Sequence, residues 1–390
     1  MAIGPQDNLP MLEGLKVVDL TSVVFGPYAT QILADYGAEV TKIEAPGGDV
    51  YRYGAKHAKT PGMGPGFIAL NRGKKSLMLD LKQTPDVERL RSLLSEADVF
   101  IHNVREEAIG RLGFGYEAVK ALKPDIIYVH CVGFGSGGPY AGLQAYDDVI
   151  QAATGTTSLL PRVDGNERPR YLPSLIADKV AGLHAAYATM AAITHRLRTG
   201  RGQHIEVPMF EAFASFMMKE HLDGHTFDPP NNGAGYSRQV DPNRQPFQTK
   251  DGWISIVPYI LPHFPLVVKL LGDAEFASQD RWKDTATLVR CAPELYAKIS
   301  ELSAAKTTDE CVQIMRGANI PCMPAVDLDE VIKDEHLNAT GFFERSHHPS
   351  EGALFQMRDP NRFSDWEQGP LGDAPLLGEH NNEDQGQNPR

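Results

Sequence analysis

The order of apolar and polar stretches near the N-terminus predicts a strand, a helix and a second strand. Val17–Leu20 is an apolar run of strand length, and Glu39–Glu44 is a second strand candidate. Between them, Tyr28–Tyr36 is expected to be a helix that follows a turn at Gly26 and Pro27. Two strands joined by a helix over so short a stretch indicate a βαβ unit with parallel strands.

The same alternation continues through the N-terminal half. Pro85–Ala97 predicts an amphipathic helix, with Val87, Leu90, Leu93 and Leu94 on one face. Three more strands are expected, at Ser76–Asp80, Val99–Ile101 and Ile126–Val129. This pattern predicts a doubly wound, Rossmann-like α/β domain with a parallel sheet, whose ligands bind at the carboxyl ends of the strands.

The second half predicts a long helix and a second, smaller domain. Leu175–Thr199 is the longest helix signal, and glycines at 200 and 202 end it. A strand at His204–Val207 and a helix at Glu211–Leu222 follow, then a linker at Asn231–Gly235. A small α+β region is expected between Gln248 and Pro324. The expected division is a large domain over 1–225, a small domain over 226–325, and a return to the large domain with an irregular tail over 326–390.

Composition and charge narrow the classes of function. The chain has 390 residues, of which 42% are hydrophobic and 23% charged, which is ordinary for globular proteins and excludes a chain disordered throughout. Asp and Glu number 50 against 38 Lys and Arg, so the net charge is −12. Such a charge disfavours nucleic acid and anionic membranes as partners. An anionic ligand would need basic residues gathered locally.

The compartment is expected to be the cytoplasm. The first eight residues lack the basic and then apolar stretches of a signal peptide, and no apolar run reaches the roughly 20 residues of a membrane helix. The four cysteines, at positions 131, 291, 311 and 322, show no C-x-x-C spacing. Neither a disulfide framework nor a zinc framework is indicated.

Two cofactor motifs are only partly matched. Gly133–Gly138 fits G-x-G-x-x-G after a strand, but Pro139 and the residues after it favour a loop where a dinucleotide site needs a helix. The first strand-to-helix turn carries only Gly26, so a nicotinamide-dependent dehydrogenase is disfavoured. His221 and His225 have helical spacing, but no third ligand is suggested, and no metal site is expected.

Basic residues gather in two loops at expected strand ends. Asn71–Ser76 contains Arg72, Lys74 and Lys75, and Lys82 lies close behind. The second loop carries Arg105 and Arg111. A basic run can be an ordinary solvated turn. Two such loops at comparable strand ends, in an acidic chain, favour a ligand that bears phosphate.

Asp178 stands at the start of the long Ala-rich helix and allows two interpretations. It could be an N-cap, which contributes about 1 kcal/mol. It could also be a carboxylate nucleophile, because a helix N-terminus stabilises a negative charge and offers N–H groups to an oxyanion. Spacing alone does not separate these interpretations.

A resemblance does separate them. Taken in order, blocks along nearly the whole chain resemble the class III coenzyme A transferases, the CaiB/BaiF family that includes formyl-CoA transferase and carnitine CoA-transferase. The blocks are Leu12–Thr21, Gly26-Pro27, Leu33–Glu44, Asn71–Ser76 with Leu79–Lys82, Arg111–Gly113, Gly133–Gly135, Ala177-Asp178, Arg198–Gln203, Ile320–Pro324 and Leu377–His380. Their joint order is specific, although no single block is.

The resemblance implies an acyl-CoA:carboxylate CoA-transferase. Asp178 would attack a thioester to give a mixed anhydride and then an enzyme–CoA thioester, a reaction that needs no metal or redox cofactor, only coenzyme A as a substrate. By motif match, coenzyme A would contact these residues: Val24, Phe25, Leu79, Lys82, Asn103, Val104, Arg105, Arg111, Tyr146 and Asp147.

Three departures from the family pattern bear on the substrate. The formyl- and oxalyl-handling branch often has Gln at the position of Val24, and it has a glycine run where this chain reads Val257–Pro262. An apolar or longer carboxylic acid is therefore expected. The racemase branch has His next to the acid at Asp147, where this chain has Tyr146. A 2-methylacyl-CoA racemase and a non-catalytic acyl-CoA-binding protein remain as alternatives.

The resemblance also implies a homodimer of two chains that thread through each other like linked rings. Asn231–Gly235 would be the outward linker between the domains, and Pro321–Pro324 the return. The segment from Val326 to Gly378 would then rejoin the large domain.

Overall fold

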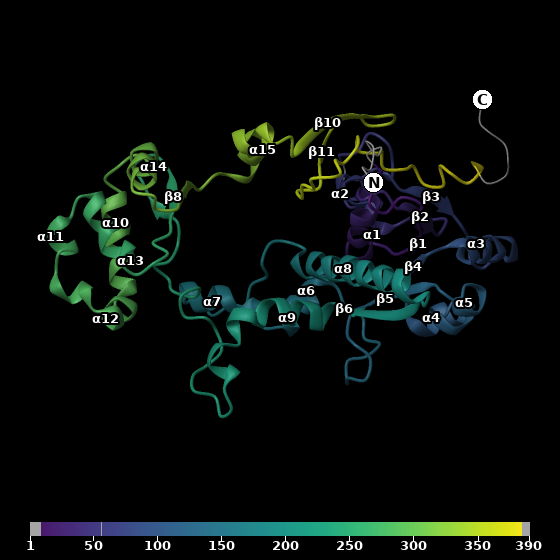
Figure 1. The fold of residues 1–390 in the computed structure, drawn as a ribbon, viewed down its shortest axis with the longest axis horizontal. Helices are drawn as coiled ribbons and strands as arrows, with labels where there is room; N and C mark the ends of the chain where they lie inside the picture. The colour runs from purple at the N-terminus through teal and green to yellow at the C-terminus, as the bar shows by residue number, and fades with distance from the viewer. Residues whose placement is uncertain (1–8, 56, 384–390) are drawn as a thin grey trace, which may run out of the picture. The chain divides into compact units, whose positions relative to one another are not determined.

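In a computed structural model, the strands expected in the large domain pair into one six-stranded parallel sheet (Figure 1). Residues 9–55 and 57–383 are described. The strands are β1 (Lys16–Leu20), β2 (Glu39–Glu44), β3 (Lys75–Met78), β4 (Val99–His102), β5 (Ile127–Val132) and β6 (Gln203–Pro208). The expected α/β class and these strands are confirmed, with ends shifted by a few residues at most.

The strand order is β3-β2-β1-β4-β5-β6, the order of the dinucleotide-binding fold. The chain therefore reverses its direction of winding between β1 and β4. In open parallel sheets, ligands bind outside the carboxyl ends of the strands at this switch point. The loops that follow β1 and β4 are where a site should be sought.

The chain divides into two compact units, and the sheet belongs to unit 1 (residues 1–156, 171–219 and 336–390). Its helices are α1 (Phe25–Asp35), α2 (Pro65–Asn71), α3 (Thr84–Glu96), α4 (Glu106–Arg111), α5 (Tyr116–Leu122), α6 (Asp147–Ala153), α8 (Ile176–Thr199) and α9 (Met209–His221), the last of which ends in unit 2. A hairpin of β10 (Phe343–His348) and β11 (Gly352–Met357) lies in the C-terminal part. The first eight residues, on which the signal-peptide argument rests, and residues 384–390 of the tail lie outside the described residues.

One side of the sheet carries an apolar core with α3, α4 and α5. Leu90 and Leu94 of α3, fully buried as their helical spacing predicts, pack with Val18 of β1 and Phe100 of β4. Side chains alternate along a strand, so Asp19, next to Val18, points to the opposite face. Charged side chains are buried on that opposite face, and some of them bind the loop that follows β1.

The long helix α8 packs against α1 because both present small residues. A Cβ atom at Gly182 would lie 2.9 Å from the carbonyl oxygen of Phe25, so the close approach of the two helices requires glycine there. Gly200, with φ of +70°, ends α8 in the left-handed conformation that glycine favours.

Unit 2 (residues 157–170 and 220–335) has its own antiparallel sheet and apolar core. The sheet order is β7-β8-β9, and Val267 and Leu295 are fully buried in that core. The elements are α7 (Leu159–Asp164), β7 (Phe247–Gln248), β8 (Trp253–Ile256), α10 (His263–Leu271), α11 (Ala274–Ala277), α12 (Thr285–Arg290), α13 (Ala292–Ser303), α14 (Thr308–Gly317), β9 (Cys322–Pro324) and the start of α15 (Glu335–Ala339). The domain limits drawn from the sequence stay a prediction. Within the described residues, no helix combines the length and apolar character needed to cross a membrane.

Candidate active site

The loops after β1 and β4 are joined by a reciprocal pair of hydrogen bonds. The backbone N–H of Ser22 donates to Oδ1 of Asn103 at 3.1 Å, and Nδ2 of Asn103 donates to the carbonyl of Ser22 at 3.0 Å. Asn103, expected to contact coenzyme A, thus also holds the two loops of the switch point together.

A cavity of about 330 Å³ opens at this switch point. Its lining includes Ser22 and Val23 from the loop after β1. Four of the ten residues expected to contact coenzyme A also line it: Asn103, Val104, Arg105 and Tyr146. The structure therefore brings these four together, although they come from two separate loops.

Asp178 lies in the first turn of α8 and is linked to the lining of this cavity through Asp147. Its backbone N–H donates to Oδ2 of Asp147 at 3.1 Å, and Asp147 follows the cavity residue Tyr146. The helix begins at Ile176, Leu175 occupies the N-cap, and no side chain caps this end. The N-cap interpretation of Asp178 is thus wrong, because its carboxylate caps no backbone group.

The environment of Asp178 disfavours its charged form. The residue is only 7% exposed, and no described residue donates a hydrogen bond to its carboxylate. Burial, and then the negative charge of Asp147, raise the pKa of Asp178 to about 7. The carboxylate is therefore poorly solvated and about half ionised near neutral pH. A perturbed carboxylate beside a cavity is a candidate for catalysis.

Asp147 is fixed at the start of α6. Its Oδ1 accepts a hydrogen bond from Nε2 of Gln151 at 2.6 Å, and its Oδ2 faces the N–H of Asp178. It is 3% exposed, whereas its neighbour Tyr146 is 65% exposed. The two residues expected to act together at coenzyme A thus have different surroundings: Asp147 is buried beside Asp178, and Tyr146 is open to solvent.

Three basic residues of the expected site are exposed and available to an anion. The charged groups of Lys82, Arg105 and Arg111 form no ion pair with any residue in the described part of the chain. Lys82 follows the carboxyl end of β3, and Arg105 follows that of β4.

The remaining expected contacts are buried. Val24 is 2% exposed, Phe25 4% and Leu79 2%. Leu79 packs in the core with α3, while Val24 and Phe25 form the start of α1 directly after the cavity residue Val23. These side chains support the site, and a ligand would meet them chiefly through the backbone.

Lys74, in the basic run where the sequence suggested a phosphate loop, is not available to a phosphate. Lys74 is 3% exposed, and its Nζ lies 3.3 Å from Oδ2 of Asp19 and donates to the hydroxyl of Thr30 at 2.7 Å. Burial lowers the pKa of Lys74 to about 8. Lys75 is exposed but forms an ion pair with Glu383. Lys74 therefore balances a buried acid inside unit 1.

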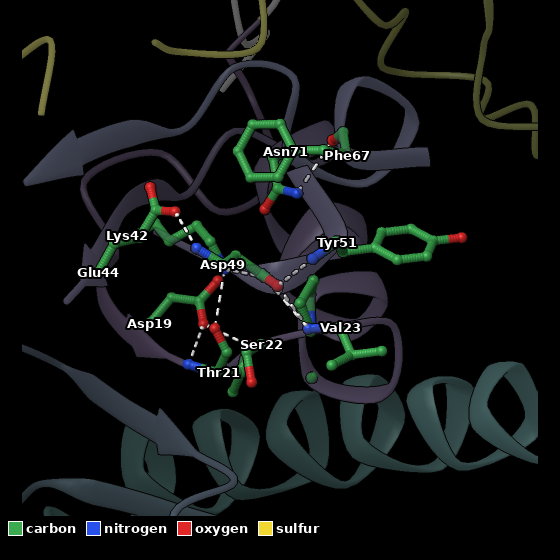
Figure 2. A network of polar contacts seen from close by, with 12 residues as sticks. Asp19, Thr21, Ser22, Val23, Lys42, Glu44, Asp49, Tyr51, Phe67 and Asn71 are labelled. Carbon is green, nitrogen blue, oxygen red and sulfur yellow. Dashed lines mark hydrogen bonds and ion pairs between the residues drawn. The ribbon is translucent and has the colours of Figure 1, made fainter. Parts of the chain in front are cut away.

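Sequence reasoning missed a group of buried charges beneath the first loop. Asp19 of β1, Lys42 and Glu44 of β2 and Asp49 are all less than 5% exposed. Asp19, Lys42 and Asp49 bind residues 21–23, and Glu44 accepts from the N–H of Asp49 (Figure 2). One signal was available: Lys42 and Glu44 lie within a strand whose other residues are mostly apolar or β-branched. Charged residues in such a strand are seldom buried without partners.

The alternatives for a dinucleotide find no support in this geometry. After Gly133–Gly138, the next helix begins only at Asp147, so the glycines open no helix. In the first loop, the backbone N–H of Val23 donates to the Asp49 carboxylate, an acid near the place where a pyrophosphate would need donors.

His221, one of the two histidines with helical spacing, has a structural partner. Its Nδ1 accepts from the N–H of Tyr236 at 3.2 Å.

The sheet order, the cavity at its switch point and the buried carboxylate are features typical of an α/β enzyme whose ligand binds at the strand ends. A model of CoA-transferase family III matches residues 12–381. The chain belongs to this family, so it is an enzyme of the class III CoA-transferase type. The resemblance that the sequence blocks carried is confirmed.

Named relatives and solved structures agree with this family. Formyl-CoA:oxalate CoA-transferase of Streptomyces coelicolor is 31% identical over 394 residues, covering 95% of this chain and 93% of its own. Succinyl-CoA:glutarate CoA-transferase of Homo sapiens is 29% identical over 380 residues, covering 96% and 85%. A CaiB/BaiF family protein from Brucella suis has a TM-score of 0.82 and 29% identity, covering 97% and 99%. These names do not favour the racemase alternative.

Proposed function

We propose that this chain transfers coenzyme A from an acyl-CoA donor to a carboxylic acid, with Asp178 as the covalent nucleophile. The observation that carries the proposal is the buried, weakly solvated carboxylate of Asp178, whose backbone N–H donates to Asp147, the residue next to the cavity residue Tyr146. An ionised carboxylate that lacks hydrogen-bond donors is a better nucleophile than one in water.

The reaction would proceed through two enzyme-bound species. A carboxylate oxygen of Asp178 attacks the thioester carbonyl, the C–S bond breaks, and an aspartyl mixed anhydride and the CoA thiolate form. The thiolate then attacks the aspartyl carbonyl and expels the donor acid, which leaves an enzyme–CoA thioester. An incoming carboxylate reverses these steps and departs as the new thioester. Every bond is exchanged among these groups, so the proposed chemistry needs no metal or redox cofactor.

The acyl group is proposed to be apolar or longer than formate and oxalate. Val24 is apolar and only 2% exposed, so its side chain offers a small acid no hydrogen bond. The relatives' names include short acids as well as succinate and glutarate, so the family admits substrates of different length. Cytoplasmic location remains part of this proposal.

A panel of CoA thioesters and carboxylic acids tests the proposal. We expect new thioesters to form with at least one donor–acceptor pair, detected by chromatography. Exchange of the α-proton with solvent in the absence of any acceptor acid, without transfer, would instead indicate a racemase.

The exposed basic residues predict where the phosphates of coenzyme A bind. Replacing Arg105 with glutamate should raise KM for the acyl-CoA about tenfold or more while changing KM for the free acid far less. The loss should shrink as salt rises, because exposed charges are screened over about 8–10 Å at moderate ionic strength. Steady-state kinetics at two salt concentrations measure both effects.

Arg198→Glu is the matched control, because Arg198 is exposed at the far end of α8. It carries the same change of charge roughly 30 Å from Asp178, at 1.5 Å of rise per helical residue. Equal effects of Arg105→Glu on the thioester and the acid would contradict a phosphate contact at Arg105.

We also propose the interlocked homodimer that the family resemblance implies. Separating linked rings requires a chain to open, so the dimer should persist at concentrations on the order of nanomolar, and its loss should coincide with unfolding. Light scattering or mass photometry across a dilution series checks this. A folded, active monomer at low concentration would exclude the interlocked arrangement.

A further inference from the structure

The carboxylate of Asp49 binds two separate parts of the backbone near the site. Oδ1 and Oδ2 each accept a hydrogen bond from the N–H of Val23 at 3.1 Å. Oδ1 also accepts from the N–H of Tyr51 at 2.9 Å. Figure 2 shows both backbone nitrogens directed at this one side chain. Asp49 therefore ties the loop after β1 to the segment that carries Tyr51.

Lys42 holds Asp49 from the other side. Its Nζ lies 3.1 Å from Oδ2 of Asp49 and donates to the carbonyl of Thr21 at 2.8 Å. The side chains of Lys42 and Asp49 are 0% and 1% exposed. A buried ion pair is weak evidence for stability, because desolvation offsets much of the attraction. The pair instead fixes the position of the Asp49 carboxylate, which binds the backbone of the loop.

Val23 shows what that geometry requires. Its φ of +73° lies in the left-handed region, which is strained for a β-branched residue. The two hydrogen bonds that its N–H donates to the Asp49 carboxylate, and the adjacent pair between Ser22 and Asn103, keep the loop in this conformation. The strained residue lines the switch-point cavity.

Tyr51 is the second group that Asp49 holds. Its ring packs on Gly66, where an added Cβ atom would come within 2.5 Å of the ring. Burial, and next the negative charge of Asp178, raise the pKa of the Tyr51 phenol. Tyr51 is only partly buried.

We propose that Asp49 is a positioning residue, which holds the backbone of Val23 at the cavity and the backbone of Tyr51 in one fixed arrangement, so that the loop after β1 is kept in place for the reacting acyl group. This inference rests on the proposed transferase function. Asp49 touches no substrate in this account. It acts through the two backbone groups that it binds, and Lys42 keeps its carboxylate in place.

The test variant is Asp49→Asn. The groups that bind Asp49, which are Val23 N, Tyr51 N and Lys42 Nζ, are all donors. The amide nitrogen of asparagine is also a donor, so it must face one of them and that hydrogen bond is lost. A displacement of about 1 Å at a reacting centre can lower the rate by about 100-fold. We expect kcat for transfer to fall by about that factor, with KM for the acyl-CoA changed less than about threefold.

Two further variants separate positioning from folding. Val23→Gly relaxes the strained loop and leaves the Asp49 side chain unchanged. Glycine accepts the positive φ, so this variant should fold. Its kcat should also fall, because the loop is no longer held in one conformation. Asp35→Asn is the matched control, because it neutralises another carboxylate that is shielded from solvent in an ion pair, with Arg72, at the opposite end of α1. Its kcat should equal that of the wild type.

The outcomes distinguish this inference from the proposed function. An active wild type together with folded Asp49→Asn and Val23→Gly variants of unchanged kcat would overturn the positioning role alone. A loss of kcat in Asp35→Asn as large as in Asp49→Asn would also overturn it, since any buried charge would then serve. An inactive wild type across the substrate panel would overturn the proposed function, and this inference with it.

Discussion

Asparagine in place of Asp178 is expected to lower kcat for transfer by about 10⁴-fold or more, because the amide cannot form the mixed anhydride. The side chain keeps its shape, and its backbone N–H can still donate to Asp147. Binding of coenzyme A should therefore stay within a few-fold of the wild type. Initial rates with the best donor and acceptor, together with calorimetric binding of coenzyme A, measure the two quantities.

The control for this loss is Asp148→Asn. Asp148 is an exposed carboxylate in the first turn of α6, next to Asp147, so it tests whether any negative charge near the site matters. It should keep the wild-type rate within a few-fold. A fully active Asp178→Asn enzyme would remove Asp178 from the mechanism. A loss of coenzyme A binding as large as the loss of rate would mean that the residue supports the fold of the site and not the chemistry.

The same substitution is expected to stabilise the protein at alkaline pH. Folding raises the pKa of Asp178 from 3.8 to about 7, so between these values the folded state binds more protons than the unfolded state. The contribution of Asp178 to the free energy of unfolding is fully present below about pH 4 and is lost as pH rises towards 7. At 1.36 kcal/mol per pKa unit, the total loss is at most about 4 kcal/mol.

Asparagine carries no charge to bury, so the free energy of unfolding of this variant, relative to the wild type, should grow by about 3 kcal/mol between pH 5 and pH 8. Urea unfolding at both pH values measures it, and Asp148→Asn should show no comparable change. An advantage that is the same at both pH values, or a less stable variant at pH 8, would show that the burial of Asp178 does not disfavour its charge.

The parallel sheet could be predicted from the sequence because its strands are short apolar runs at regular intervals. Val99–His102 is buried on both faces, and such a run leaves few alternatives to a central strand. The α3 helix was equally clear, since Leu90 and Leu94 repeat with the helical period and both are fully buried. Local patterns decide these elements.

The buried charges could not be predicted in the same way. Lys74 stands in a basic, glycine-containing run that looks like a solvated turn, and only the fold brings it to Asp19, far away along the chain. Asp49 follows two glycines and looks like a turn residue, yet its carboxylate is almost fully buried. Pairs of this kind depend on which strands become neighbours, and a single sequence does not reveal that.

Asp178 falls between these cases. The family blocks assigned it as the nucleophile, but its spacing fitted an N-cap equally well. Capping and catalysis both place an acid in the first turn of a helix, where the dipole favours negative charge. They differ in what the carboxylate touches. Here the helix starts two residues earlier, and the carboxylate is left without a backbone partner among the described residues.

The most direct test of the account follows oxygen from the acceptor acid into Asp178. In the proposed reaction, the thiolate takes the acyl group from the final anhydride, so one carboxylate oxygen of Asp178 comes from the acceptor in each turnover. The enzyme is turned over with an ¹⁸O-labelled acceptor acid, digested, and analysed by mass spectrometry of the peptide that contains Asp178. The account predicts ¹⁸O in that side chain and in no other carboxylate. New thioester without label in Asp178 would contradict a covalent role for this residue.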